Sequence, residues 1–351
     1  MFFVPAMTFA HSSNTGDSVE HSRRAIEHVR TTWPFFNRTA GADHFLWLTG
    51  DRGACAWPGE SAPALANVIK VVHWGWHRPG RGGAMPAGWG ALPNQRWGCF
   101  RPSRDIVAAP YWLGQGRVAR GTWEVGPFNT SEIPPRLLFF AGGVRRDQPD
   151  YSNGVRQEFH SLFGAGQHPD VTIHEGPIAG YVEHIRSSRF CLAPSGYGWG
   201  IRLSQLMAQG CVPVIVQDGV SQPWEDMLPY EEFSVRIPQR RIPQIAALLA
   251  AVPDETYLAL RTGVARHWRA FVWTDDVGGE AYDFMIRSLR VRWRRLSARM
   301  YDSYPLVTLP APTPAPPKPL SQWWWSHLGT AAVIAAGTGG LLAAWRRMQT
   351  G

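Results

Sequence analysis

The sequence predicts an α/β fold with a parallel sheet, and three features of residues 187–236 carry that prediction. Residues 189–194 form a short apolar run that ends at a proline, which is typical of a buried strand. Apolar side chains then recur at helical spacing until Gly210, a residue type that often ends helices. Residues 212–216 (VPVIV) are rich in β-branched side chains, as in strands buried on both faces of a parallel sheet. Strand, helix and strand in this order predict a βαβ crossover.

The turn between the first strand and the helix is rich in glycine. Residues 195–200 (SGYGWG) hold three glycines, so the backbone can approach a ligand closely. The loop opens onto a helix whose N-terminus attracts anions, and Arg202 lies just inside that helix. A glycine-rich turn without a ligand is the alternative interpretation. Because the loop, Arg202 and Glu225 all belong to one sheet edge, we favour a phosphate-bearing ligand.

Length and charge limit the possible functions. The chain has 351 residues, enough for two α/β domains, and its formal net charge is +8. Apart from the run RVRWRR at 290–295, the basic residues are scattered along the chain. No stacking platform or recognition motif for nucleic acid accompanies them. We therefore attribute the positive charge to a binding site for an anionic ligand and to a solvated basic helix. We expect no nucleic-acid partner.

Several motifs resemble those of exostosin-like glycosyltransferases, which form glycosyltransferase family 47. Residues 187–218 (SSRFCLAPSGYGWGIRLSQLMAQGCVPVIVQD) resemble the C-terminal signature of that family. Residues 33–45 (WPFFNRTAGADHF) resemble its N-terminal landmark, and two further landmarks resemble residues 99–112 and 134–144. The resemblance implies a GT-B architecture, in which two Rossmann-like domains face a cleft and the C-terminal domain holds a nucleotide sugar.

The resemblance divides the chain into four parts. Residues 1–133 are expected to form an acceptor-side Rossmann-like domain that is incomplete at its start, and residues 134–303 the nucleotide-sugar domain with a C-terminal helix. Residues 304–322 are expected to form a proline-rich stalk. Residues 323–347 are predicted to be a transmembrane tail, because tryptophans and two arginines flank an uncharged apolar run. A disordered tail rich in alanine and glycine is the alternative.

The resemblance implies a donor site on the C-terminal domain. Arg156 matches a family position, and arginine grips phosphate groups bidentately. Gln205 departs from the pattern, because the family has a glutamate there that bonds the nucleotide ribose. A neutral amide loses the charge-assisted hydrogen bond, so we expect weaker or altered donor binding. Solvated loops are the alternative for Arg145 and Glu225. The predicted donor-binding residues are Arg145, Arg156, Ser195, Gly196, Tyr197, Arg202, Gln205 and Glu225.

Asp43 and His44 are the predicted catalytic residues. Histidine titrates near neutral pH and a neighbouring carboxylate can fix its tautomer, so the pair could take a proton from the acceptor. The alternative is that Asp43 caps a turn and His44 packs in a satisfied hydrogen bond. No aspartates stand at i and i+2, and the four cysteines lack zinc spacing, so we expect no metal and no cofactor.

Cysteines and asparagines suggest two modifications. In a secretory lumen the cysteines could form one or two disulfides, but Cys191 and Cys211 belong to successive buried strands, and we expect buried thiols. Asn37 and Asn129 each begin an N-x-S/T glycosylation triplet. Asn37 lies inside a family motif, so we interpret that triplet as structural.

The resemblance implies an inverting, metal-independent transferase that moves a sugar from a UDP-sugar to a glycan acceptor in cell-wall or glycoconjugate synthesis. It also implies a Golgi membrane protein with a lumenal catalytic domain, in a homo- or hetero-oligomer. One rival is a weak or inactive glycan-binding or partner subunit, which Gln205 favours. A second rival is a dinucleotide-dependent oxidoreductase, which is disfavoured because residues 195–201 lack the G-x-G-x-x-G spacing.

Overall fold

A computed structural model describes the chain in segments as far as residue 302. The described ranges are 1–6, 18–50, 53–56, 66–77, 100–111, 125–126, 128–148, 151–164, 166–198 and 200–302. Met1–Tyr301 form one compact unit, and the second unit begins at Asp302. The predicted stalk and transmembrane tail lie outside the described residues. Within the described ranges, none of the helices has both the length and the apolar character needed to span a bilayer.

The first sheet is parallel and lies in the N-terminal part of the chain. Its order is β1–β2–β3–β5, with β1 at Phe2–Phe3, β2 at His44–Leu48, β3 at Ile69–Val72 and β5 at Ile106–Val107. Helices α1 (Ser18–Thr32) and α2 (Phe35–Thr39) precede β2. Ile26 of α1 is fully buried in the same apolar cluster as Leu46 of β2. The residue pattern predicts a helix at 18–31 and strands at 45–48 and 69–73, and the structure confirms all three.

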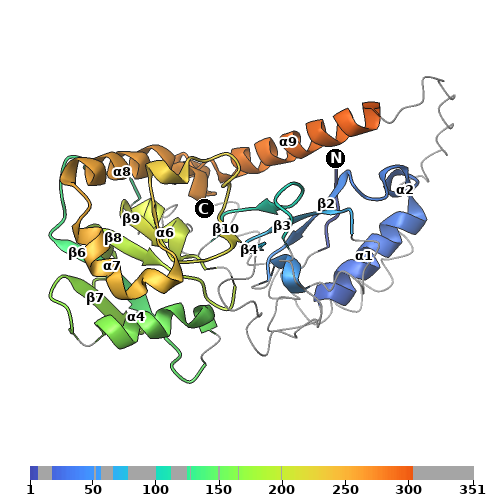
Figure 1. The fold of residues 1–351 in the computed structure, drawn as a ribbon. Helices are drawn as coiled ribbons and strands as arrows, with labels where there is room; N and C mark the ends of the chain where they lie inside the picture. Colours follow the sequence, from blue (N-terminus) through green and yellow to red (C-terminus); the bar gives the residue numbers. More distant parts are fainter. Residues whose placement is uncertain are drawn as a thin grey trace, which may run out of the picture. The chain divides into compact units, whose positions relative to one another are not determined.

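The second sheet is also parallel, in the order β11–β9–β8–β6–β7. Its strands are β6 (Arg136–Gly142), β7 (Val171–Glu175), β8 (Ser188–Ala193), β9 (Val212–Ile215) and β11 (Val235–Arg236). Its helices are α4 (Val155–Phe163), α5 (Tyr181–Arg186), α6 (Arg202–Gln209), α7 (Ile245–Ala250) and α8 (Asp254–His267). α4 and α8 lie on opposite faces of the sheet (Figure 1). Two parallel sheets, each with its own helices, agree with the predicted α/β fold of the GT-B type.

The predicted βαβ crossover is confirmed in β8, α6 and β9. Helix α6 buries most of its side chains, and it ends at Gly210 with φ 78°, in the left-handed region that favours glycine. A Cβ atom at Gly210 would lie 2.6 Å from the ring of Phe128, so a larger residue would also lose space. The 3-10 helices among the described residues are η2 (Gly53–Ala56), η4 (Tyr151–Gly154), η5 (Tyr230–Glu232), η6 (Gln239–Gln244), η7 (Trp268–Phe271) and η8 (Asp275–Val277).

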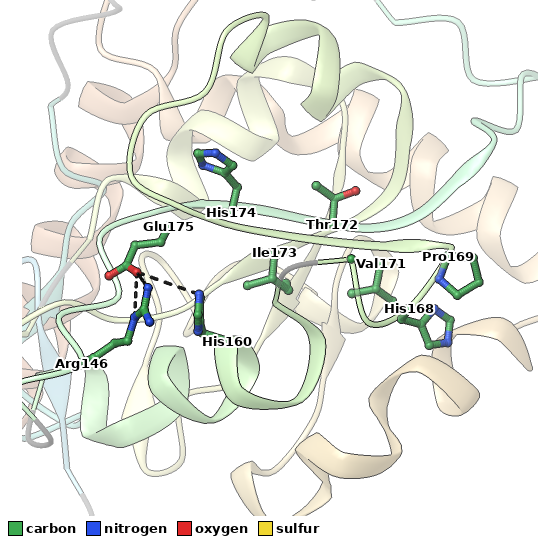
Figure 2. A pocket seen from close by; sticks show the side chains of 10 residues that line it. Arg146, His160, His168, Pro169, Val171, Thr172, Ile173, His174 and Glu175 are labelled. Carbon is green, nitrogen blue, oxygen red and sulfur yellow. Dashed lines mark hydrogen bonds and ion pairs between the residues drawn. The ribbon is translucent and has the colours of Figure 1, made fainter.

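A hollow lies along β7, the edge strand of the second sheet. Its volume is about 640 Å³, and its lining includes His160, His168 and His174 (Figure 2). Arg146 forms an ion pair with Glu175 at one end of the hollow, so these two charges neutralise each other. Across the described residues, no group of three or more His, Cys, Asp or Glu side chains could hold a metal ion.

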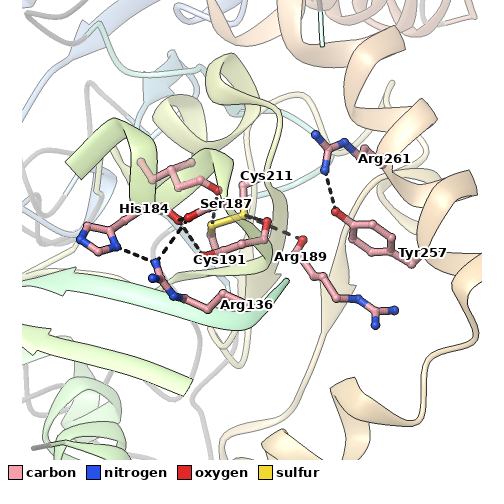
Figure 3. The surroundings of a disulfide bond; sticks show 10 residues. Arg136, His184, Ser187, Arg189, Cys191, Cys211, Tyr257 and Arg261 are labelled. Atoms are coloured by element: carbon pink, nitrogen blue, oxygen red, sulfur yellow. Dashed lines mark hydrogen bonds between the residues drawn. A yellow bond between two sulfur atoms is a disulfide. The ribbon is translucent and has the colours of Figure 1, made fainter. Parts of the chain in front are cut away.

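A disulfide joins the two central strands of the crossover and corrects the prediction of buried thiols. Cys191 in β8 is bonded to Cys211, which directly precedes β9, and their Cα atoms lie 6.0 Å apart (Figure 3). The parallel register pairs Cys191 with Pro213, and this offset brings Cys211 within the range that a disulfide requires. Cys55 lies in η2, and Cys99 lies outside the described residues.

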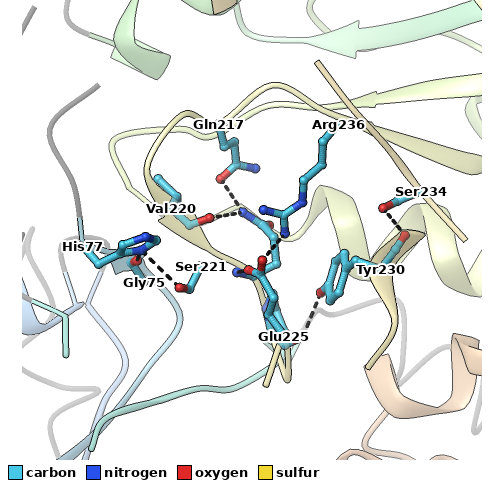
Figure 4. Close-up of polar contacts among 11 residues, drawn as sticks. Gly75, His77, Gln217, Val220, Ser221, Glu225, Tyr230, Ser234 and Arg236 are labelled. Atoms are coloured by element: carbon cyan, nitrogen blue, oxygen red, sulfur yellow. Dashed lines mark hydrogen bonds and ion pairs between the residues drawn. The ribbon is translucent and has the colours of Figure 1, made fainter. Parts of the chain in front are cut away.

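A short antiparallel ribbon connects the two parts of the compact unit. β4 (Gly75–Trp76) pairs with β10 (Val220–Ser221), and His77 Nδ1 lies 3.1 Å from Ser221 Oγ (Figure 4). A Cβ atom at Gly75 would lie 2.5 Å from the carbonyl oxygen of Ser221. The ribbon therefore requires glycine at position 75, and the sequence did not predict it.

Helix α9 (Ala281–Asp302) makes a second connection between the two parts. The buried Arg292 donates from Nη2 to the carbonyl oxygen of Asp105, 2.8 Å away, and pairs with the carboxylate of Asp226. Asp105 precedes β5 in the first sheet, whereas Asp226 follows the ribbon strand β10. The predicted C-terminal helix is confirmed, and it contacts both parts of the compact unit.

Candidate active site

Two arginines converge where β6 and β8 end. Arg202 donates from Nη2 to the carbonyl oxygen of Ala141, 2.8 Å away near the end of β6. Arg156 donates to the carbonyl oxygen of Gly143 after β6 and to that of Ser195 after β8, both at 2.9 Å. Ligands of parallel α/β sheets bind at this carboxyl edge. The structure therefore brings the predicted residues Arg156, Ser195 and Arg202 together.

Neither of these guanidinium groups has an anionic partner among the described residues. Arg156 is only 7% exposed, and its hydrogen-bond acceptors are two backbone carbonyls and the hydroxyl of Tyr151. Burial lowers the pKa of Arg156, and burial together with the neighbouring Arg156 charge lowers the pKa of Arg202 to about 10. Buried charges are normally paired, because an unpaired charge costs several kcal/mol. An anionic ligand would supply the missing charge.

Aromatic rings hold both side chains in place. The guanidinium carbon of Arg156 lies 5.4 Å from the ring centroid of Phe140 and 4.8 Å from that of Tyr151. The guanidinium carbon of Arg202 lies 5.4 Å from the Phe140 centroid and 5.2 Å from that of Tyr181. Cation–π contacts of this kind attract the cation without cancelling its charge. The arginines are thus fixed and still able to bind an anion.

A glycine allows Arg202 to reach the end of β6. A Cβ atom at Gly142 would lie 2.8 Å from Nη2 of Arg202. The next residue, Gly143, has no atom within 4 Å of the position that its Cβ would take. Only the first of these adjacent glycines is therefore required for the position of the arginine.

The glycine-rich loop contacts the segment between β6 and α4. Arg145 donates from Nη1 to the hydroxyl of Tyr197 at 3.1 Å, and the Ser152 amide donates to the carbonyl oxygen of Gly196 at 2.9 Å. Arg145, Ser152 and Asn153 have φ of 53°, 59° and 51°, a conformation that costs energy in residues with side chains. The buried Ser152 hydroxyl has no hydrogen-bond partner among the described residues. The loop contacts thus place the predicted Arg145, Gly196 and Tyr197 beside Arg156.

Gln205 and Glu225 occupy different environments. Gln205 lies on α6 and is 9% exposed, and its side-chain amide makes no hydrogen bond with the described residues. Glu225 accepts from the Gln222 amide at 2.6 Å and pairs with Arg236 at 2.8 Å (Figure 4). The carboxylate of Glu225 therefore fixes its own loop. It makes no contact with Arg156 or Arg202 in the structure.

Asp43 and His44 lie at the amino end of β2, opposite the edge where ligands of parallel sheets bind. Both are buried, and Asp43 accepts hydrogen bonds from Thr39 at 2.5 Å, Arg38 at 2.7 Å and His44 Nδ1 at 2.7 Å. Burial opposes ionisation of Asp43, but these hydrogen bonds outweigh it and lower its pKa. Burial lowers the pKa of His44, whose ring stacks on Phe2. This geometry is that of a packed, internally neutralised cluster.

Sequence reasoning gave no role to His73, which directly follows β3 at its carboxyl end. Its Nδ1–H donates to the carbonyl oxygen of Ala108 at 2.9 Å, and burial lowers its pKa to about 4. His73 lines a cavity of about 20 Å³ together with Gly200, from the glycine-rich loop, and Leu203 of α6. The sequence feature that could have identified His73 is its position at the end of the predicted strand at 69–73.

Curated proteins with similar sequences include plant proteins named as probable glycosyltransferases. One is a probable glucuronosyltransferase of Oryza sativa subsp. japonica, 29% identical over 72% of this chain and 58% of its own length. Another is a probable β-1,4-xylosyltransferase of Arabidopsis thaliana, 27% identical over 73% of this chain and 60% of its own length. The chain thus spans about three fifths of the length of these relatives.

A solved sucrose-phosphate synthase from Thermosynechococcus elongatus is similar at 12% identity and a TM-score of 0.34, over 82% of this chain and 79% of its own. A TM-score this low bears on neither fold nor function. The Exostosin GT47 domain, by contrast, matches residues 1–252, which include the first sheet, the arginines and the glycine-rich loop. The chain belongs to the family of exostosin-like GT47 glycosyltransferases.

Proposed function

We propose that the protein transfers a sugar from a UDP-sugar to a glycan acceptor, with inversion at the anomeric carbon and without a metal ion. The observation that carries the proposal is a pair of guanidinium groups, on the buried Arg156 and the partly buried Arg202. Neither has a carboxylate partner among the described residues. A diphosphate is the anion whose size and charge suit two adjacent arginines and a glycine-rich loop. The names of the relatives favour a glucuronosyl or a xylosyl donor.

In the proposed reaction, the acceptor hydroxyl attacks the anomeric carbon while the bond to the UDP oxygen breaks. Negative charge develops on the leaving diphosphate, and fixed cations stabilise it most strongly where water is excluded. Arg156 and Arg202 are held by carbonyls and rings, so they need little reorganisation. Arg145 donates to the hydroxyl of Tyr197 in the glycine-rich loop, and both residues contribute to the proposed site. The leaving group thus receives its counter-charge from the chain itself.

Two candidates can take the proton of the acceptor hydroxyl. One is the predicted pair Asp43 and His44, which is enclosed at the amino edge of the first sheet. The other is His73, at the carboxyl edge, in a cavity that Gly200 and Leu203 also line. Donation from Nδ1 to Ala108 fixes its tautomer and leaves Nε2 as the basic nitrogen. The position at the donor side supports His73.

The activity is tested by incubating the full chain with a UDP-sugar that carries radiolabelled xylose or glucuronic acid. Xylan oligosaccharides serve as the acceptors. We expect labelled product, and we expect His73→Gln to lower kcat at least tenfold with UDP affinity unchanged. His44→Gln is the matched control, and its effect should be on stability. UDP binding without turnover of either sugar would favour the non-catalytic partner subunit.

The disulfide supports a secretory location. Disulfides persist in oxidising compartments, and Cys191–Cys211 lies in the core of the donor-binding sheet. We therefore propose that the domain works in a lumenal compartment such as the Golgi. The predicted transmembrane tail at 323–347 would attach the protein to the membrane. Alkaline carbonate extraction tests this by comparing the membrane retention of the full chain with that of a chain lacking residues 323–347.

A further inference from the structure

Two triplets in the chain match the acceptor pattern for N-linked glycans, and the structure separates them. Residues 37–39 read N-R-T, and residues 129–131 read N-T-S. An acceptor triplet needs an accessible asparagine amide and an accessible hydroxyl, in a segment that can extend into the transferring enzyme. Both asparagines are exposed, so exposure alone does not distinguish them.

The first triplet is built into a buried cluster. Asn37 and Thr39 belong to helix α2. The Thr39 hydroxyl donates to the Asp43 carboxylate at 2.5 Å, and the Asp43 amide donates back to that hydroxyl at 3.4 Å. Asp43 itself is fully buried. Presenting Thr39 to another enzyme would therefore unwind α2 and expose the carboxylate.

The second triplet lies outside every helix and strand, between Phe128 and the start of β6. The Ser131 amide and hydroxyl both donate to Oδ1 of Asn129, at 3.1 and 2.7 Å, so the triplet forms an Asx turn. The Nδ2 nitrogen of Asn129 donates to no described residue. Phe128 packs against Trp268, which fixes the turn at the surface. A glycan at Asn129 would extend into solvent without disturbing the core.

The disulfide supplies an independent observation. Cys191 and Cys211 are 0% and 1% exposed, so their bond forms as the domain folds. Folding in an oxidising lumen places the chain where N-linked glycans are attached.

We propose that Asn129 is an N-glycosylation site of this protein and that Asn37 is not. In the transfer, Nδ2 of Asn129 attacks the anomeric carbon of a lipid-pyrophosphate-linked oligosaccharide. A C–N bond forms, the C–O bond to the pyrophosphate breaks, and the nitrogen loses one proton. The lipid pyrophosphate leaves with the electron pair of the broken bond, and nothing is oxidised or reduced.

The test is expression of the full chain behind a cleavable secretion signal in insect cells, with a reporter acceptor triplet added at the C-terminus. Peptide mass spectrometry after amidase deglycosylation in heavy-oxygen water identifies each modified asparagine. We expect label at Asn129 and at the reporter, and none at Asn37. A labelled reporter without label at Asn129 overturns the proposal. Label at Asn37 overturns the structural distinction between the two triplets.

Conservative variants test the same point by gel mobility. Ser131→Ala and Asn129→Gln should each remove one amidase-sensitive mobility shift, whereas Ser131→Thr and Asn37→Gln should keep it. Because Ser131→Thr retains the hydroxyl, a loss of the shift in that variant would contradict the proposal. The mass-spectrometric result on the unmodified sequence decides the matter even if a variant fails to fold.

Discussion

Two buried charged clusters in this protein differ in how their charge is balanced. In the cluster around Asp43, the carboxylate accepts from Arg38, Thr39 and His44. In the cluster of Arg156 and Arg202, every partner among the described residues is neutral. Burial of charge is common to both clusters, so burial alone does not identify a binding site. The absence of a counter-charge distinguishes the second cluster as the place for an anionic ligand.

The largest expected effect is on stability and comes from the balanced cluster. Asp43→Asn removes the buried charge that holds Arg38 and His44, and we expect the free energy of unfolding to fall by about 3 kcal/mol. Urea denaturation of the full chain measures this. UDP affinity of the folded variant should not change. A loss of UDP binding without a loss of stability would reverse the roles of the two clusters.

In the cluster of Arg156 and Arg202, we expect substitution to lower UDP affinity and to leave stability almost unchanged. Arg202→Met removes a partly buried cation that no described carboxylate balances, so the free energy of unfolding should change by less than about 1 kcal/mol. UDP affinity should fall roughly thirtyfold, because a hydrogen bond to a charged group contributes about 2 kcal/mol. Calorimetry and urea denaturation on the same preparation check both values. A strongly destabilised variant with normal UDP affinity would contradict the comparison.

Adjacent glycines sharpen the claim that the position of Arg202 matters. Gly142→Ala places a methyl group 2.8 Å from Nη2 of Arg202 and should displace it, so we expect UDP affinity to fall about tenfold. Gly143→Ala meets nothing within 4 Å and is the matched control. Equal affinities in the two variants would show that the approach of Arg202 to β6 is irrelevant to binding.

The smallest expected effect concerns Gln205. Gln205→Glu restores the carboxylate that the family pattern has at this position, and a charge-assisted hydrogen bond exceeds a neutral one by about 1 kcal/mol. UDP affinity should therefore rise about fivefold, with UMP and UDP affected alike because the ribose is common to both. No change in either affinity would mean that position 205 does not contact the nucleotide.

The sequence allowed the α/β fold and the place of Arg202 to be predicted, because the 187–218 motif links strand, loop and helix in one local pattern. Arg156 lies outside that motif and was predicted from its match to a family position. The β4–β10 ribbon was missed because strands of two residues have no periodicity. The disulfide was missed because strand register, which brings Cys211 next to β8, is a tertiary property. The carbonyl partners of the arginines were not predictable, since every residue type carries a carbonyl.

Calorimetric titration of the full chain with uridine, UMP and UDP tests the central claim most directly. If Arg156 and Arg202 form a site for a diphosphate, affinity should rise with each added phosphate and be largest for UDP. Excess inorganic pyrophosphate should then compete with UDP. Equal affinity for uridine and UDP, or no binding of UDP, would contradict the assignment of this cluster as the donor site.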